Sequence, residues 1–133
     1  MAFTAKSANG YKVATETGIA IADSAGANVV TSYSSTINDD LSNKKFVVYL
    51  EVTEASAGDG ALDVTVQGSH DGTTFVDLDA SVIDDVDPTG LNKESGLADL
   101  TSIYAPYYRL KIFTDGTDTE DAAAVTVAYA FKP

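Results

Sequence analysis

The sequence places the three side-chain types of a hydrolase triad next to one another at Ser69, His70 and Asp71. A triad needs its nucleophile, base and orienting acid to converge in space, and consecutive residues of a turn cannot orient one another in that way. His70 is also the only histidine of a chain without cysteine, so carboxylates would have to supply every other ligand of a zinc ion. We therefore predict neither catalysis nor a zinc site here.

Carboxylates concentrate in two short segments, residues 84–87 and 115–121. Calcium prefers carboxylate and carbonyl oxygens, which makes these segments the candidates for a cation site. Neither segment matches the twelve-residue EF-hand loop or the nonapeptide calcium repeat. Asp and Gly are also the ordinary residues of turns. We predict solvated turns with no metal and no cofactor, and calcium binding is the alternative.

Acidic pairs such as Asp39-Asp40 and Asp84-Asp85 lie in turn-like sequence and not on strands that frame a cleft. This placement gives no support to glycoside hydrolysis by two carboxylates. The sequence also contains no phosphate-binding glycine loop, dinucleotide fingerprint or nucleophile elbow. We therefore predict that the protein is not an enzyme.

Aromatic residues are the remaining candidates, namely seven Tyr and five Phe with no Trp. Most of them fall at alternating strand positions, where core packing accounts for them. The tyrosines around Pro106 fit that pattern less well, and Tyr combines a large apolar body with a polar tip that suits interfaces. With carboxylates from the acidic loop added, the candidate interaction residues are Tyr33, Asp85, Asp87, Tyr104 and Tyr107. If Tyr104, Tyr107 or Tyr108 lines an exposed groove, sugar binding is favoured.

The elements that position these residues are strands, because apolar and polar residues alternate along the chain. The clearest runs are residues 45–53, 62–67, 75–78, 108–112 and 125–131, and weaker ones are 18–22 and 28–33. We expect 62–67 to be half-buried, with its polar residues facing solvent. Turn residues predict three hairpins, which join the first run to the second, the second to the third, and the fourth to the fifth.

Two regions lack this alternation. Residues 79–105 predict a long connection that contributes to contacts, with one helical turn possible at 93–103. Residues 1–16 predict either a frayed arm or an edge strand that is completed in an assembly. We thus expect one domain, residues 17–133, folded as an all-β antiparallel sandwich of the jelly-roll or immunoglobulin-like type.

Composition limits the partners. The chain of 133 residues is 44% hydrophobic and 21% charged, which is typical of one globular domain. Its net charge of -12 argues against nucleic acid and anionic membranes, since both need clustered Lys and Arg. The sequence has no apolar run as long as a membrane span or a signal-peptide core, so we expect synthesis and folding in a cytoplasm.

Three segments carry a likeness to a known family. Residues 64–78 contain Q-G-S-H-D-G-T-T-F, residues 107–112 contain Y-Y-R-L-K, and 125–129 form an alternating closing strand. In these three motifs the sequence resembles small structural proteins of tailed bacteriophage heads, including decoration or cement proteins. The likeness covers about residues 45–133.

The resemblance implies a role in the virion. It implies copies on the outer capsid surface, often as homotrimers, that clamp neighbouring major capsid protein subunits after synthesis in the host cytoplasm. It carries over no catalytic residue. The alternative is a carbohydrate-binding or adhesion module of a phage fibre, a spike or a cell-surface protein.

Overall fold

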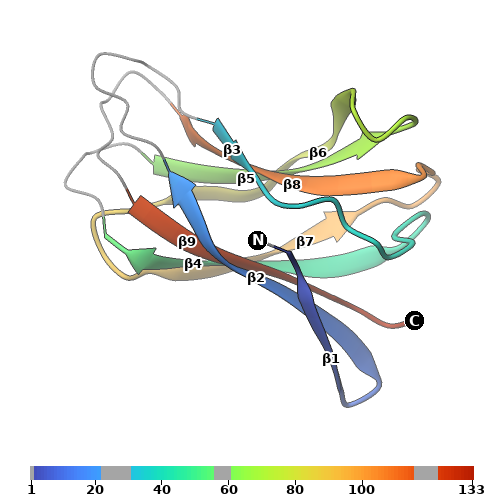
Figure 1. Cartoon of the computed structure of the whole chain (residues 1–133), viewed down its shortest axis with the longest axis horizontal. Coiled ribbons are helices and arrows are strands. Elements are labelled where there is room, and N and C mark those ends of the chain that lie inside the picture. Colours follow the sequence, from blue (N-terminus) through green and yellow to red (C-terminus); the bar gives the residue numbers. More distant parts are fainter. Residues whose placement is uncertain (1, 22–30, 56–60, 116–122) are drawn as a thin grey trace.

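The computed structural model describes residues 2–21, 31–55, 61–115 and 123–133, which fold into two antiparallel sheets that face each other (Figure 1). Sheet A has the order β1 (Thr4–Ala8), β2 (Tyr11–Ile21), β9 (Ala123–Phe131), β4 (Lys45–Glu54), β7 (Lys93–Asp99). Sheet B has the order β3 (Thr31–Tyr33), β8 (Tyr107–Asp115), β5 (Ala61–Ser69), β6 (Phe75–Val86). No helix capable of crossing a membrane occurs within these ranges.

The strand order identifies the sandwich as a jelly roll. Strands β2-β9-β4-β7 face strands β3-β8-β5-β6, and the chain passes between the sheets at most of its connections. This order is the one that two interlocked Greek keys produce. The prediction of an all-β antiparallel sandwich is confirmed, and of the two types considered the structure has the jelly roll.

Alternating side chains from both sheets form the core. The largest inward-facing sets come from β4, β5, β8 and β9, and each follows the period of two that the sequence shows. These buried residues are Phe46, Val48, Leu50, Val52, Leu62, Val64, Val66, Tyr108, Leu110, Ile112, Val125, Val127, Tyr129 and Phe131.

Two of the three predicted hairpins are wrong. Strands β4 and β5 lie in opposite sheets, and so do β8 and β9, whereas β5 and β6 form the expected hairpin. Alternation shows which residues of a strand face the core, but both sheets face the same core. The pattern therefore cannot show to which sheet a strand belongs.

The expected long connection at 79–105 is also wrong, as is the helical turn within it. Strand β6 continues to Val86 through three register shifts, and β7 occupies part of the segment expected to be helical. Leu97 points outward from β7 while Leu100 is buried, so their spacing does not describe one helical face. Because the pairing of β6 is irregular, its apolar and polar residues do not alternate with a regular period of two, and the sequence pattern does not identify it as a strand.

Strand β5 is buried on both faces, which corrects the expectation of a half-buried strand. Its outward residues Thr65 and Gln67 are covered by side chains of the neighbouring strands. Arg109 of β8 donates to Gln67 Oε1 (2.8 Å), and Lys111 reaches Asp77 of β6 (3.1 Å). Long cationic side chains thus form a second layer over the polar face of this strand.

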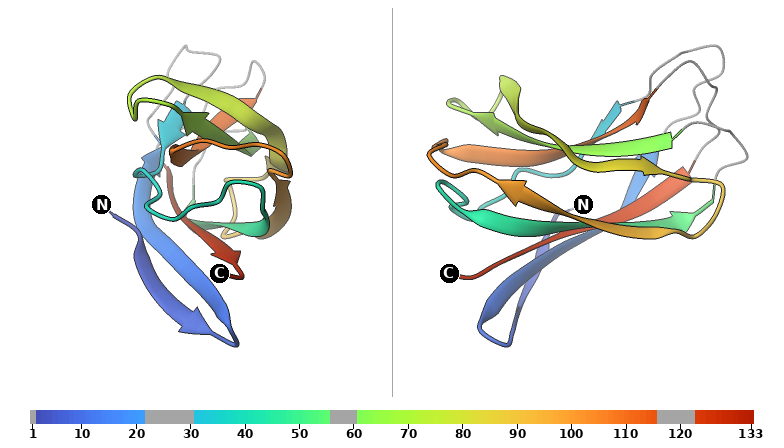
Figure 2. Two further views of the ribbon diagram at one scale, coloured as in Figure 1. Left: turned by 90° about the vertical axis from the view of Figure 1, so that its right-hand side faces the viewer. Right: turned by 180° about the vertical axis from the view of Figure 1, so that it is seen from behind.

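The first strand belongs to a hairpin that projects from the sandwich (Figures 1 and 2). Asn9 and Gly10 have φ values of 51° and 81°, as the two central residues of a type I′ turn require. Strand β1 is therefore an edge strand, and all five of its residues are exposed. The expected division after residue 16 falls within β2, which pairs with β9 on both sides of this position.

The two open sides of the sandwich are closed by different contacts. At the β2–β3 side, Ser35 N donates to the buried Glu16 carboxylate (2.8 Å). At the β6–β7 side, the backbone of β6 lies so close to Gly96 that a Cβ there would sit 1.8 Å from the carbonyl oxygen of Val82. Only glycine permits this approach.

We expect Gly96→Ala to destabilise the protein by about 3 kcal/mol, because the new methyl group meets backbone and not a flexible side chain. Urea denaturation measures this change. Gly90→Ala is the matched control, since its nearest atom would be the end of the Asn92 side chain at 3.1 Å. Equal stability of the two variants would contradict the proposed close contact.

Candidate binding surface

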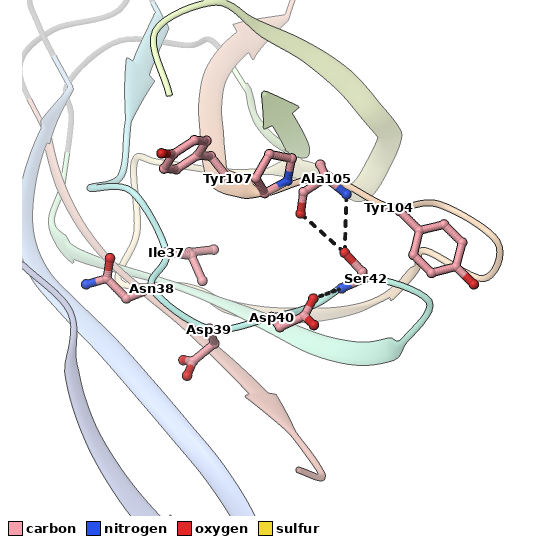
Figure 3. A pocket seen from close by; sticks show the side chains of 9 residues that line it. Ile37, Asn38, Asp39, Asp40, Ser42, Tyr104, Ala105 and Tyr107 are labelled. Atoms are coloured by element: carbon pink, nitrogen blue, oxygen red, sulfur yellow. Dashed lines mark hydrogen bonds between the residues drawn. The ribbon is translucent and has the colours of Figure 1, made fainter. Parts of the chain in front are cut away.

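A groove of about 600 Å³ opens at one end of the sandwich (Figure 3). It lies between the β3–β4 connection, residues 34–44, and the β7–β8 connection, residues 100–106. Its lining combines carboxylates, an amide and a hydroxyl with two tyrosine rings and small apolar groups. The lining residues are Ile37, Asn38, Asp39, Asp40, Ser42, Tyr104, Ala105, Pro106 and Tyr107.

Backbone hydrogen bonds hold the first wall against sheet B. Ser34 N donates to Leu110 O (2.9 Å), and Ile37 N donates to Tyr108 O (2.7 Å). Leu41, farther along the same wall, is fully buried. The connection is thus anchored at both ends of its groove-lining stretch.

The second wall is tied to the first. Asn43 N donates to Ile103 O (2.9 Å), and Ser102 N donates to the side-chain oxygen of Asn43 (2.8 Å). Asn43 and Ser102 both have left-handed backbone conformations, with φ values of 57° and 63°. Both walls are therefore positioned before any ligand binds.

Tyr107 and Tyr108 take opposite roles because consecutive strand residues face opposite sides. Tyr108 is buried, and its hydroxyl accepts from Ala105 N (2.9 Å) and contacts Ser42. Tyr107 is 40% exposed and Tyr104 is 71% exposed, and both line the groove. Two of the tyrosines around Pro106 thus form the surface, while the third supports it.

The carboxylates of the groove differ in their surroundings. Asp39 accepts from Lys12 and from Tyr129, and burial together with this carboxylate raises the pKa of Tyr129 above its usual range. Hydrogen bonds from the backbone and side chain of Ser42 lower the pKa of Asp40. A general acid needs a raised carboxyl pKa, so Asp40 is suited to accepting hydrogen bonds and not to donating protons. The groove is therefore suited to binding a ligand through hydrogen bonds and aromatic contacts.

The other predicted interaction residues lie elsewhere. Tyr33 is on the outer face of sheet B, where the Arg109 guanidinium stacks 3.7 Å from its ring centre and 4.0 Å from that of Phe75. This stacking already occupies one face of Tyr33. Because Tyr33 lies on this outer face of sheet B, it does not line the groove.

Asp85 and Asp87 are at the opposite end of the sandwich. Leu62 pairs with Val86 at one end of β5, and Ser69 pairs with Tyr107 at the other, roughly 20 Å away. Asp85 has a left-handed φ of 58°, and Thr89 hydrogen bonds lower the pKa of Asp87. The five residues are therefore divided among three places.

Ser69, His70 and Asp71 form the turn of the β5–β6 hairpin. The Ser69 hydroxyl donates to Asp71 Oδ1 (2.9 Å), while the exposed His70 imidazole lies 3.7 Å from the other carboxylate oxygen. Backbone donors of Thr74 and Thr73, followed by the Ser69 hydroxyl, hold the pKa of Asp71 well below its usual range. The carboxylate organises the turn.

No three His, Asp or Glu side chains in the described ranges are grouped to hold a metal ion. The acidic candidate at 115–121 lies mostly outside these ranges.

Sequence reasoning did not single out Asp39, Asp40 or Ser42 as parts of the groove with Tyr104 and Tyr107. The available signal was the Asp39-Asp40 pair, which was interpreted as an ordinary turn. The two walls are about 60 residues apart in the chain, and only the strand order brings them together.

Comparisons with known proteins show a similarity of fold. No protein-family model and no curated protein matches the chain. Similar solved structures include infectious bursal disease virus of the Gx strain (17% identity, TM-score 0.57) and of the Gt strain (16%, 0.53). In both cases 96% of this chain is covered, but it spans only 33% of the viral chain. A CBM4 structure has 12% identity and a TM-score of 0.46 over 97% of this chain and 88% of that one.

We expect the Asp71 carboxylate to stabilise the fold at neutral pH. Since its pKa is lowered on folding, this contribution is present above the ordinary value of 3.8 and is lost progressively as the pH falls below it. Asp71→Asn should therefore lower Tm at neutral pH, and its difference from the unchanged protein should narrow in acid. Thermal unfolding at several pH values measures this, with Asp84→Asn as the control outside the turn. A difference that does not vary with pH would contradict the expectation.

Proposed function

We propose that this chain is a non-enzymatic structural protein of a phage virion, which binds the outside of the head and stabilises contacts between major capsid protein subunits. The fold is one that proteins of virus particles also use. The Q-G-S-H-D-G-T turn, on which the resemblance to phage head proteins rests, forms the β5–β6 hairpin. Fold alone does not assign a function, so further support must come from the surface.

The observation that carries the proposal is the projecting β1–β2 hairpin. One edge of β1 has no partner strand among the described residues, and both faces of the strand are exposed. An uncovered edge in an isolated protein invites pairing with another chain. In a virion, a neighbouring subunit would cover this hairpin.

The charge of the chain fits the same role. A net charge of -12 keeps free copies apart before assembly and leaves an acidic, hydrated exterior afterwards. Many weak contacts, repeated over a shell, then provide the total affinity.

Co-sedimentation with bare phage capsids tests this proposal. We expect the chain to bind and to saturate at a fixed number of copies per capsid. A variant that lacks residues 2–8 removes β1 and should bind more weakly, provided that its thermal unfolding remains cooperative. A chain that stays in the supernatant at every concentration would exclude capsid decoration.

The second candidate function is carbohydrate binding, and the groove favours it. Tyr104 and Tyr107 are both exposed at the groove, which is the arrangement expected of a sugar site. Tyrosine rings can pack on the apolar faces of a sugar, and the carboxylate of Asp40 can accept from its hydroxyl groups.

A glycan array tests this alternative. Specific binding that is reduced at least tenfold by Tyr107→Ala, but not by Tyr11→Ala, would support it. Tyr11 is similarly exposed but lies on the hairpin and not at the groove. Absence of binding to any glycan would exclude it for the sugars present.

A further inference from the structure

The turn of the β1–β2 hairpin determines which backbone groups of β1 are free. A two-residue loop makes the residues on either side of it, Ala8 and Tyr11, a hydrogen-bonded pair, and such pairs alternate along the hairpin. The N–H and C=O groups of Ala8 and Lys6 therefore point toward β2. Those of Ala5 and Ser7 point away from β2, where no described strand lies. Two donors and two acceptors are thus available to another strand.

Lys6 lies in the middle of this free edge, between the two residues with available groups. It forms no ion pair with any described carboxylate, whereas Lys12, on the other strand of the hairpin, pairs with Asp39. Residues 2–15 contain these two lysines and no acidic residue, which gives a local charge of +2 in a chain of -12. The free edge is therefore cationic.

A hollow of about 300 Å³ beside the edge adds hydroxyl groups to this charge. It contains no acidic side chain, and the polar residues of its lining are Lys6, Thr4, Thr15 and Thr17. Thr4 and Lys6 are two residues apart, so they share one face of β1. Threonine hydroxyls and a lysine ammonium both donate hydrogen bonds to a carboxylate. The side chains beside the free backbone groups thus favour an acidic residue.

A second copy of the chain does not fit this edge. Within β1, an antiparallel copy uses all the free groups only when Ala5 of each copy pairs with Ser7 of the other. The two Lys6 side chains then lie directly opposite each other. Like charges in that position destabilise a sheet, whereas a carboxylate opposite Lys6 stabilises it. Charge therefore favours a partner other than this chain.

We propose that an extended segment of another protein joins sheet A as an added strand, antiparallel to β1, with an Asp or Glu opposite Lys6. Its backbone pairs with Ala5 and Ser7, and its carboxylate accepts from the Lys6 ammonium and from threonine hydroxyls of the hollow. That the segment belongs to the major capsid protein rests on the proposed function. A contact this short is weak by itself and gains its strength from repetition over a shell.

Hydrogen exchange, measured for each amide by NMR, tests the backbone part of this inference. In the unchanged chain the amides of Ala5 and Ser7 should exchange faster than those of Lys6 and Ala8, which donate to β2. The probe is the segment Thr-Val-Glu-Val-Thr, joined ahead of Ala2 by a flexible Gly-Ser linker, because tethering provides an effective concentration in the millimolar range.

The tethered segment should slow exchange at Ala5 and Ser7 and leave that at Lys6 and Ala8 unchanged. The matched control carries Lys in place of the Glu of the segment and should slow exchange much less, because its Lys lies opposite Lys6. Absence of protection with both segments, or equal protection by the two, would overturn the proposal. Protection that rises with the concentration of the untagged chain would identify a second copy as the occupant and would also overturn it.

Co-sedimentation with bare phage capsids tests the same contact in the proposed partner. Ser7→Pro removes an outward N–H but no bond to β2, so it should weaken binding while thermal unfolding remains cooperative. Ser7→Ala keeps this N–H and should bind more tightly than Ser7→Pro. Lys6→Glu should weaken binding about tenfold, because it places a carboxylate opposite a carboxylate. Lys132→Glu is the matched control, since Lys132 is exposed and undergoes the same change of charge outside β1.

The two experiments distinguish a failure of this inference from a failure of the proposed function. Capsid binding that Ser7→Pro and Lys6→Glu leave unchanged would overturn strand addition, and capsid decoration would stand. A chain that ignores capsids, but whose Ala5 and Ser7 are protected by the Glu segment and not by the Lys segment, would exclude decoration. The free edge would then still be a binding site for an acidic strand.

Discussion

The rest of the structure depends on the contact between the backbone of β6 and Gly96 of β7. The sandwich buries its core only if its sides are closed, and here a carbonyl oxygen occupies the space that any side chain would need. The bulged pairing of β6 with β5 brings this carbonyl across the gap between the sheets. Asp79, also on β6, accepts from Asp99 N (3.1 Å) and extends the closure to the end of β7.

The surfaces of the closed sandwich differ in the side chains that they expose. In sheet B, Arg109 and Lys111 cover the polar outer face of β5. Both donate hydrogen bonds to side chains of the same sheet, Gln67 and Asp77. One end of the sandwich has a preformed groove with two exposed tyrosines. Sheet A has an outer face that no described element covers, with a projecting hairpin at its edge. Within the described ranges, the exposed features on which the proposed functions rest are the groove and the β1–β2 hairpin.

The candidate residues show how far alternation can predict a site. Tyr104 and Tyr107 line an exposed groove. The sequence drew attention to them because the segment around Pro106 interrupts the strand pattern. Tyr33 was predicted as an interaction residue, and the structure adds that Arg109 stacks on its ring from a strand distant in sequence. Asp39 was interpreted only as a turn residue, and the structure shows that it also accepts from Lys12 and Tyr129 at the groove.

The sequence by itself determined the fold class, the inward residues of β4, β5, β8 and β9, and the β5–β6 turn. These features follow from local periodicity and turn chemistry, which neighbouring residues encode. The Asn9-Gly10 turn was equally local and could have been predicted. Only the tertiary structure decided which sheet each strand joined, because every strand buries the same kind of face in one shared core. The groove, the layer of cationic side chains over β5 and the uncovered face of sheet A all depend on which sheet each strand joins, so no local sequence pattern could have predicted them.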